Sequence, residues 1–117
     1  MTLDERMKVF DMLRQEELEI LSSKGLDYAG DEDALRNFKI NAERLGLTKY
    51  QVWAVYAMKH IDALLVAIKK NPDDPTRQGE TFYESILDVR NYLGLLACLR
   101  IEDDNAKGVS HELQVQP

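Results

Sequence analysis

Cysteine is almost absent from this sequence: Cys98 is the only one among 117 residues, and it lies within an apolar stretch. A single cysteine cannot form an internal disulfide, so we expect a protein of the reducing cytoplasm, with a catalytic thiol as the less favoured interpretation. No apolar stretch has the length of a membrane span, and the N-terminus carries Asp4, Glu5 and Arg6 where a signal sequence would be apolar. The sequence therefore predicts a soluble protein.

Positive charge is in the minority, with 15 lysines and arginines against 21 aspartates and glutamates and a formal net charge of -6. This balance disfavours binding to duplex nucleic acid, which needs clustered basic residues to neutralise phosphates. An anionic substrate remains compatible with it if a divalent cation bridges the substrate to carboxylates. Apolar residues make up 44% of the chain, which excludes wholesale disorder. At this length they suffice for one core and one domain.

Strand signals are lacking as well, and the spacing of apolar residues predicts four helical segments. They cover about residues 2–23, 31–46, 48–70 and 80–100. We expect an all-α helical bundle with three long helices and one short helix. Residues 1–101 would form this domain, and the polar residues 102–117 would form a loosely attached C-terminal tail that adds nothing to the core.

Local signals set these boundaries. Gly25 is expected to end the first helix and Gly46 the second, which would start near Asp31 or Asp33. Thr48 and Gln51 form a capping-box pattern at the start of the third. The residues expected to face the core are Leu3, Met7, Phe10, Leu13, Ile20 and Leu21 in the first helix, Ala34, Leu35, Phe38 and Ala42 in the second, and Trp53, Ala57, Ile61, Leu64, Leu65 and Ile68 in the third.

The last long helix carries the most informative pattern. Glu84, Asp88 and Asn91 recur at i, i+4 and i+7 within an otherwise apolar segment, so they share one helical face. A carboxylate in such surroundings is partly buried and needs a cationic partner to stay ionised. Mg²⁺ or Mn²⁺ would serve, because hard cations prefer carboxylate oxygens.

The first long helix supplies a second group of acids, Glu16, Glu17 and Glu19. On a helical wheel Glu17 falls on the apolar stripe, whereas Glu16 lies on its flank and Glu19 toward solvent. Periodicity alone therefore favours Glu17 as the inward acid. The alternative is that all three are solvated charges on a helix face. Acids from facing helices of a bundle can surround one shared metal ion, and this is the arrangement that we expect here.

Four further segments carry a family resemblance. They are Lys24-Gly25-Leu26-Asp27-Tyr28-Ala29-Gly30, Asn37-Phe38-Lys39, Lys59-His60-Ile61-Asp62 and Asp88-Val89-Arg90-Asn91-Tyr92-Leu93. In this order and spacing the chain resembles a phage-type member of the all-α MazG-like nucleotide pyrophosphohydrolases, close to the group called nucleotide modification associated domain 1. The resemblance implies hydrolysis of a nucleoside triphosphate to a monophosphate and pyrophosphate, with Mg²⁺ as cofactor, in the cytoplasm of the host if a phage encodes the protein.

The resemblance also assigns roles to residues. Metal ligands would be Glu16, Glu19, Asp62, Glu84 and Asp88, with Glu16 or Glu19 also accepting a proton from the attacking water. Nucleotide contacts would come from Lys24, Asp27, Tyr28, Asn37, Lys59, His60 and Asn91. The sequence departs from the family pattern at Ser85, which stands where the second metal-binding motif has an acid. A non-catalytic protein that captures a nucleotide on the same scaffold is therefore the alternative function, and a purely structural helical oligomer is a third.

Several of these residues also have plainer interpretations. Lys24 and Asp27 suit ordinary turn chemistry, His60 suits a hydrogen-bonded core position, and Lys59 with Asp62 suits a surface ion pair. A di-iron bundle is disfavoured because neither histidine is preceded at three residues by glutamate. Amphipathic helices of this number leave apolar surface for a second copy, so we expect a homodimer or homotetramer. The expected interface lies on the last long helix and includes Leu95 and Leu99.

Overall fold

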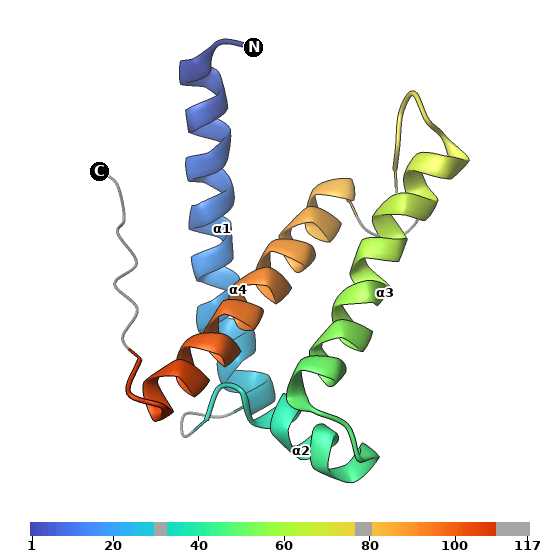
Figure 1. Ribbon diagram of the computed structural model, residues 1–117. Helices are drawn as coiled ribbons and strands as arrows, with labels where there is room; N and C mark the ends of the chain where they lie inside the picture. The colour runs from blue at the N-terminus through green and yellow to red at the C-terminus, as the bar shows by residue number, and fades with distance from the viewer. Residues whose placement is uncertain (30–32, 77–80, 110–117) are drawn as a thin grey trace.

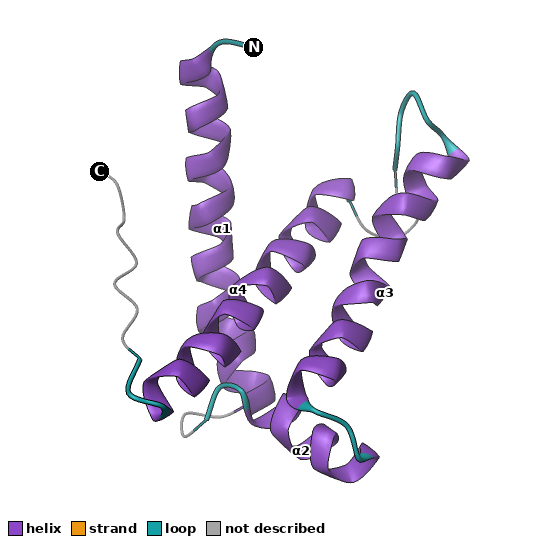
Figure 2. Ribbon diagram, viewed as in Figure 1, coloured by secondary structure: helices purple, strands orange, loops and turns teal. Residues whose placement is uncertain are grey.

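The computed structural model describes residues 1–29, 33–76 and 81–109, and of residues 23–29 only the helical backbone. This part of the chain contains no strand and folds into four helices (Figures 1 and 2). They are α1 (Leu3–Ala29), α2 (Arg36–Leu45), α3 (Lys49–Lys70) and α4 (Phe82–Ala106). The prediction of an all-α bundle with three long helices and one short helix is confirmed.

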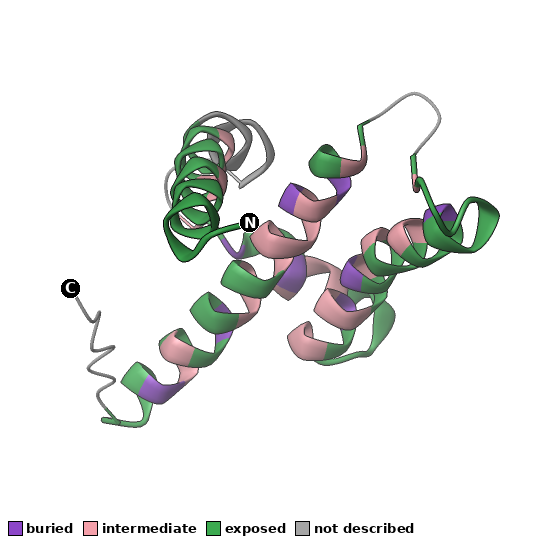
Figure 3. Cartoon of the chain, turned by 90° about the horizontal axis from the view of Figure 1, so that it is seen from above, coloured by how far each residue is buried: buried purple, intermediate pink, exposed green. Residues whose placement is uncertain are grey.

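The central element is α4, which packs against α3 on one side and α1 on the other. Figure 3 shows this arrangement from above, with α4 between its two neighbours. The short α2 packs mainly against α3 and more weakly against α1. Residues of α4 can therefore reach two different helices, depending on the side of α4 on which they lie.

Capping signals worked as the sequence predicted. The Thr48 hydroxyl accepts a hydrogen bond from the Gln51 backbone N–H at 3.1 Å, and the Gln51 side chain accepts one from the Thr48 N–H at 2.9 Å. Gly46 ends α2 with φ at +67°, a left-handed conformation that glycine adopts without steric cost. Thr81, which was not predicted as a cap, caps α4 by accepting from the Glu84 N–H at 3.1 Å. The end of α2 and the start of α3 depend on neighbours in sequence, which explains why they were predictable.

Three boundaries differ from the prediction. α1 does not stop at Gly25 but continues to Ala29, because one internal glycine costs only about 1 kcal/mol and does not by itself end a helix. α2 begins at Arg36, after a turn in which the Asp33 carboxylate accepts from the Leu35 N–H at 3.0 Å. α4 extends to Ala106, so the start of the predicted polar tail is helical.

The core lies where α2, α3 and α4 meet. Trp53 and Tyr92 tie α3 to α4, because the indole N–H of Trp53 donates to the Tyr92 carbonyl oxygen at 2.6 Å. The prediction of Leu95 and Leu99 at an interface between copies is wrong, since Leu99 is completely buried within the chain and Leu95 packs against the same cluster. The buried cluster consists of Leu35, Phe38, Ala42, Val52 and Leu99, and Tyr50, Trp53, Tyr56, Tyr92 and Leu95 pack against it.

Other apolar residues predicted to face the core are exposed instead. α3 is apolar around most of its circumference, and the side that packs carries Val52, Ala57 and Ala67. Periodicity could not choose between two apolar sides. The residues that were predicted to face the core and are exposed are Leu3, Met7, Phe10, Leu21, Ala34, Ile61, Leu65 and Ile68.

By length and composition alone α3 could also cross a membrane, which differs from our expectation. The core helix of a soluble protein can meet the same criteria.

Candidate functional site

The acidic face of α4, defined by Glu84, Asp88 and Asn91, becomes more buried along the helix. Glu84 is exposed, whereas Asp88 and Asn91 are half-buried. The Asn91 side-chain oxygen Oδ1 is buried and accepts no hydrogen bond from the described part of the chain. An unsatisfied buried acceptor of this kind costs on the order of 1–3 kcal/mol. Such a group calls for an explanation, and a bound ligand or water is one.

His60 of α3 lies beside the acidic face of α4. Its Nδ1 lies 3.5 Å from Asp88 Oδ2, and each of the two side chains keeps about a quarter of its surface exposed, 25% in both cases. The imidazole also lies over the Tyr92 ring, with 4.8 Å between centroids. The Asp88 carboxylate is therefore turned toward α3, and it forms an ion pair with His60 when the imidazole is protonated.

Glu17 of α1 reaches another element, as the helical wheel favoured. Arg90 of α4 donates to it twice, from Nε to Oε1 at 2.7 Å and from Nη2 to Oε2 at 3.1 Å. Both side chains are mostly buried, with 21% of Glu17 and 28% of Arg90 exposed. A paired, two-point contact of this type is among the stronger hydrogen-bonded ion pairs. Glu17 is thus neutralised by Arg90 within the chain.

The polar side chains of α4 contact two different helices. Asp88 and Arg90 are two residues apart, and a helix rotates by about 200° over that distance, so they point to opposite sides. Asp88 contacts α3, and Arg90 contacts α1. The sequence singled out Asp88 and Glu17 but missed Arg90 as the partner of Glu17. An arginine within an apolar helical segment was the available signal, because such a residue needs an acidic partner.

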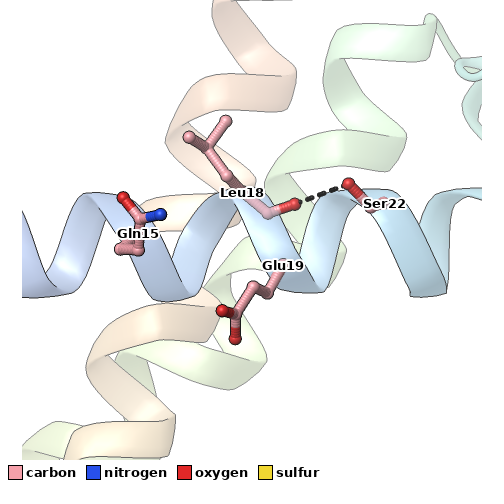
Figure 4. A pocket seen from close by; sticks show the side chains of 4 residues that line it. All are labelled: Gln15, Leu18, Glu19 and Ser22. Atoms are coloured by element: carbon pink, nitrogen blue, oxygen red, sulfur yellow. Dashed lines mark hydrogen bonds between the residues drawn. The ribbon is translucent and has the colours of Figure 1, made fainter.

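Glu16 and Glu19, the predicted catalytic acids, are both exposed on α1. Glu19 borders a hollow of about 440 Å³ that is open to solvent, and the described residues that line it lie on α1 (Figure 4). The other described lining residues are Gln15, Leu18 and Ser22, and the Ser22 hydroxyl donates to the Leu18 carbonyl oxygen at 2.9 Å. The structure does not bring Glu16 or Glu19 into a described contact with the acidic face of α4.

The remaining predicted residues are spread over the molecule. Lys59 and Asp62 are exposed on α3, and within the described residues no ion pair joins them. Asn37 is exposed on α2. The side chains of Lys24, Asp27 and Tyr28 lie outside the described residues, and their backbone belongs to α1 and not to the predicted turn.

Metal binding was expected at this site. Across residues 1–29, 33–76 and 81–109, as far as their side chains are described, no three His, Cys, Asp or Glu side chains are grouped closely enough to hold a metal ion. Ser85, at the position where the family pattern has an acid, is fully buried. The acidic face of α4 therefore offers two carboxylates, Glu84 and Asp88, spaced by one helical turn.

A separate polar cluster, which the sequence did not predict, joins the end of α4 to the start of α3. Asp103 accepts hydrogen bonds from Lys49 and from the Tyr50 hydroxyl, the latter at 2.7 Å. These two donors, Lys49 first, lower the pKa of the Asp103 carboxyl, and the bond to Asp103 raises the pKa of Tyr50. Asp103 follows Leu95 and Leu99 at intervals of four, which was the signal that the inward face continues.

Lys39 makes a similar bridge between α2 and α4. Its ammonium group lies 2.7 Å from both Asp33 and Glu102. The hydrogen bond from Lys39 lowers the pKa of Asp33, and hydrogen bonds to Asp33 and Glu102 raise the pKa of Lys39. The prediction of a loosely attached tail is therefore wrong at its start, because Glu102 and Asp103 have tertiary partners. Both bridges serve the fold and lie apart from the acidic face.

Comparisons with known proteins add no assignment. No protein-family model matches the chain, and no curated protein and no solved structure matches it either. The resemblance to MazG-like pyrophosphohydrolases stays a prediction.

Proposed function

We propose that this chain binds a nucleoside triphosphate together with a divalent cation along the acidic face of α4, and that it releases pyrophosphate from it. The observation that carries the proposal is the buried Asn91 Oδ1, an acceptor without a described donor on the same face as the half-buried Asp88. A base amino group or a ribose hydroxyl would donate to it. Satisfying a buried acceptor gives the bound state a hydrogen bond that the free protein lacks.

The carboxylates of this face suit a cation that phosphates help to hold. Glu84 and Asp88 are four residues apart and share the face, and Glu84 is open to solvent. Mg²⁺ is commonly bound by one or two carboxylates plus substrate phosphates, so this pair fits that role although it does not fit a closed, all-protein cage. A bound cation would neutralise phosphate oxygens and lower the pKa of an attacking water.

Basic and amide groups beside the carboxylates suit the rest of the nucleotide. His60 Nδ1 lies 3.5 Å from Asp88 Oδ2, and in a protonated imidazole the Nε2–H would be the donor for a phosphate oxygen. Lys59, the residue before His60 on α3, is exposed, and the family resemblance gives it a contact with the nucleotide. The family resemblance gives the proton-accepting role to Glu16 or Glu19, both of which are solvent-accessible on α1. The free thiol of Cys98 suits the reducing cytoplasm in which such a protein would work.

A second candidate function is capture of a nucleotide without hydrolysis. One observation favours it: Arg90 holds Glu17, the inward acid of α1, in two hydrogen bonds, which removes it from the set of free metal ligands. Ser85 is buried and supplies no carboxylate where the family pattern has one. A protein with these features would keep a nucleotide site and would lack the geometry that activates water.

Turnover and binding measured side by side separate the two functions. Pyrophosphate release is assayed with a panel of standard and base-modified deoxynucleoside triphosphates in Mg²⁺ or Mn²⁺, and affinity is measured by calorimetry with non-hydrolysable analogues. Hydrolysis requires release by the wild-type chain and a loss of about 100-fold or more in Asp88→Asn. Asp11→Asn is the matched control, because Asp11 is 73% exposed on α1 and its variant should keep full activity.

The other outcomes are equally informative. Micromolar binding of an analogue without any pyrophosphate release would establish capture in place of hydrolysis. Absence of binding to every triphosphate at about 1 mM, with or without metal, would contradict both functions. The chain would then be a structural helical protein, and Asp88→Asn would change no ligand affinity.

A further inference from the structure

The amide of Asn91 differs from that of a second half-buried asparagine in this fold. Asn91 Oδ1 is buried, and no donor in the part of the chain that the structure describes contacts it. Asn41 on α2 has the ordinary arrangement, because its Nδ2 donates to the Tyr56 hydroxyl at 2.9 Å. A buried acceptor without a donor lowers the stability of the free protein, and an apolar side chain of similar size would avoid that loss. Asn91 thus costs stability in the free protein, as residues that serve a ligand often do.

The carboxylates on the same face of α4 are acceptors as well. Asp88 precedes Asn91 by one helical turn and Glu84 precedes it by two, and an ionised carboxylate only accepts hydrogen bonds. A ligand edge that carries N–H groups therefore suits this face. An edge that carries a carbonyl oxygen would meet another oxygen at Asn91 and would be repelled.

An aromatic pair adjoins Asn91. Tyr92 follows it directly in the chain, and the His60 ring of α3 lies over the Tyr92 ring with 4.8 Å between centroids. His60 keeps 25% of its side chain exposed. Aromatic surfaces of this kind favour a planar base over a sugar, because a base can stack on them. The donor that suits Asn91 is therefore one on the base.

We propose that Asn91 selects the base of the bound nucleotide. It favours a base with an amino group at its edge, such as cytosine or adenine, over one with a carbonyl oxygen there, such as uracil or thymine. This preference rests on the proposed nucleotide site. Rotation about the terminal side-chain bond of an asparagine is only weakly restricted, and it brings Oδ1 to the amino group of a base that enters beside Asp88. The hydrogen bond gained and the carbonyl repelled correspond to a preference of about 10-fold or more.

Cytosine and uracil nucleotides are the matched ligands, because the two bases share one ring and differ in an amino or carbonyl group and the adjacent ring nitrogen. Calorimetry of the full chain with Mg²⁺ measures the affinities of non-hydrolysable dCTP and dUTP analogues. The wild-type chain should bind the dCTP analogue at least about 10-fold more tightly. Asn91→Leu should bring this ratio close to unity, mainly by weakening the dCTP analogue. Asn41→Leu is the matched control and should keep the wild-type ratio.

Thermal unfolding of the same variants without nucleotide is a test that does not depend on binding. Asn91→Leu should keep the wild-type midpoint or raise it, because it removes an unsatisfied acceptor. Asn41→Leu should lower the midpoint by about 3–6 °C, because the hydrogen bond to Tyr56 is lost. A lower midpoint for Asn91→Leu would show that its amide already has a partner in the free protein, and would overturn the proposal.

Two binding outcomes would overturn the base preference in different ways. Equal affinity of the wild-type chain for the two analogues, or tighter binding of the dUTP analogue, would overturn the preference and leave the proposed nucleotide site in place. Binding of neither analogue at about 1 mM would overturn the nucleotide site itself, and the base preference with it.

Discussion

The ion pair between Glu17 and Arg90 is the described polar link between α1 and α4, and removing it should weaken their packing. Arg90→Gln takes away both donated hydrogen bonds and leaves the Glu17 carboxylate without its counter-charge. Hydrogen bonds to charged groups contribute about 1.5–3 kcal/mol, whereas exposed ion pairs contribute about 0–1 kcal/mol. With 21% and 28% of the two side chains exposed, solvent screens part of the interaction. We expect a loss of about 1–2 kcal/mol in the free energy of unfolding.

A double-mutant cycle isolates the interaction from other effects of the substitutions. Urea unfolding followed by circular dichroism is measured for wild type, Glu17→Gln, Arg90→Gln and the double variant, at a fixed protein concentration. The coupling energy should be about 1 kcal/mol or more. Arg14→Gln is the control, because the pair between Arg14 and Asp11 is 3.6 Å apart and about 70% exposed, so its removal should change stability by less than about 0.5 kcal/mol. A coupling energy near zero would refute the assignment of Glu17 to Arg90.

Three further predictions concern the fold. Leu99→Ala should lower the free energy of unfolding by about 2–5 kcal/mol, since Leu99 is fully buried, whereas Leu93→Ala, at a position 53% exposed, should cost far less in the same urea titration. Thr48→Ala removes half of the capping box and should cost about 1 kcal/mol, measurable as a lower midpoint of thermal unfolding. The lowered pKa values of Asp33 and Asp103 mean that their contribution to stability is complete above the ordinary value of 3.8 and is lost as pH falls through the folded-state pKa. Asp103→Asn should therefore flatten the acid side of a stability profile, and an unchanged profile would contradict the bonds from Lys49 and Tyr50.

The helices were predictable where the deciding interactions are local. Thr48, Gln51 and Gly46 act on residues one turn away or less, so sequence alone located those ends. The end of α4 was missed because Glu102 and Asp103 are held by lysines of α2 and α3 that are distant in sequence. A run of charged residues has the same sequence pattern in a solvated tail and in a helix whose side chains form ion pairs with other helices.

The site was predictable only in part for a related reason. Partial burial of Asp88 and the inward position of Glu17 both follow from helical periodicity. Their partners do not, because the rotation of α4 between two neighbours is set by packing of the whole core. That rotation turns Asp88 to His60 and Arg90 to Glu17. The sequence predicted acids of α1 and α4 around one ion, and the described contacts give each inward acid a basic partner of its own.

The most direct test of the proposed nucleotide site is a crystal structure of the full chain with Mg²⁺ and a non-hydrolysable nucleoside triphosphate. The expected result is phosphate density beside Glu84, Asp88 and His60, with Asn91 Oδ1 accepting a hydrogen bond from the base or ribose. Density for the triphosphate at a site remote from α4, with Asn91 still unsatisfied, would contradict the proposal.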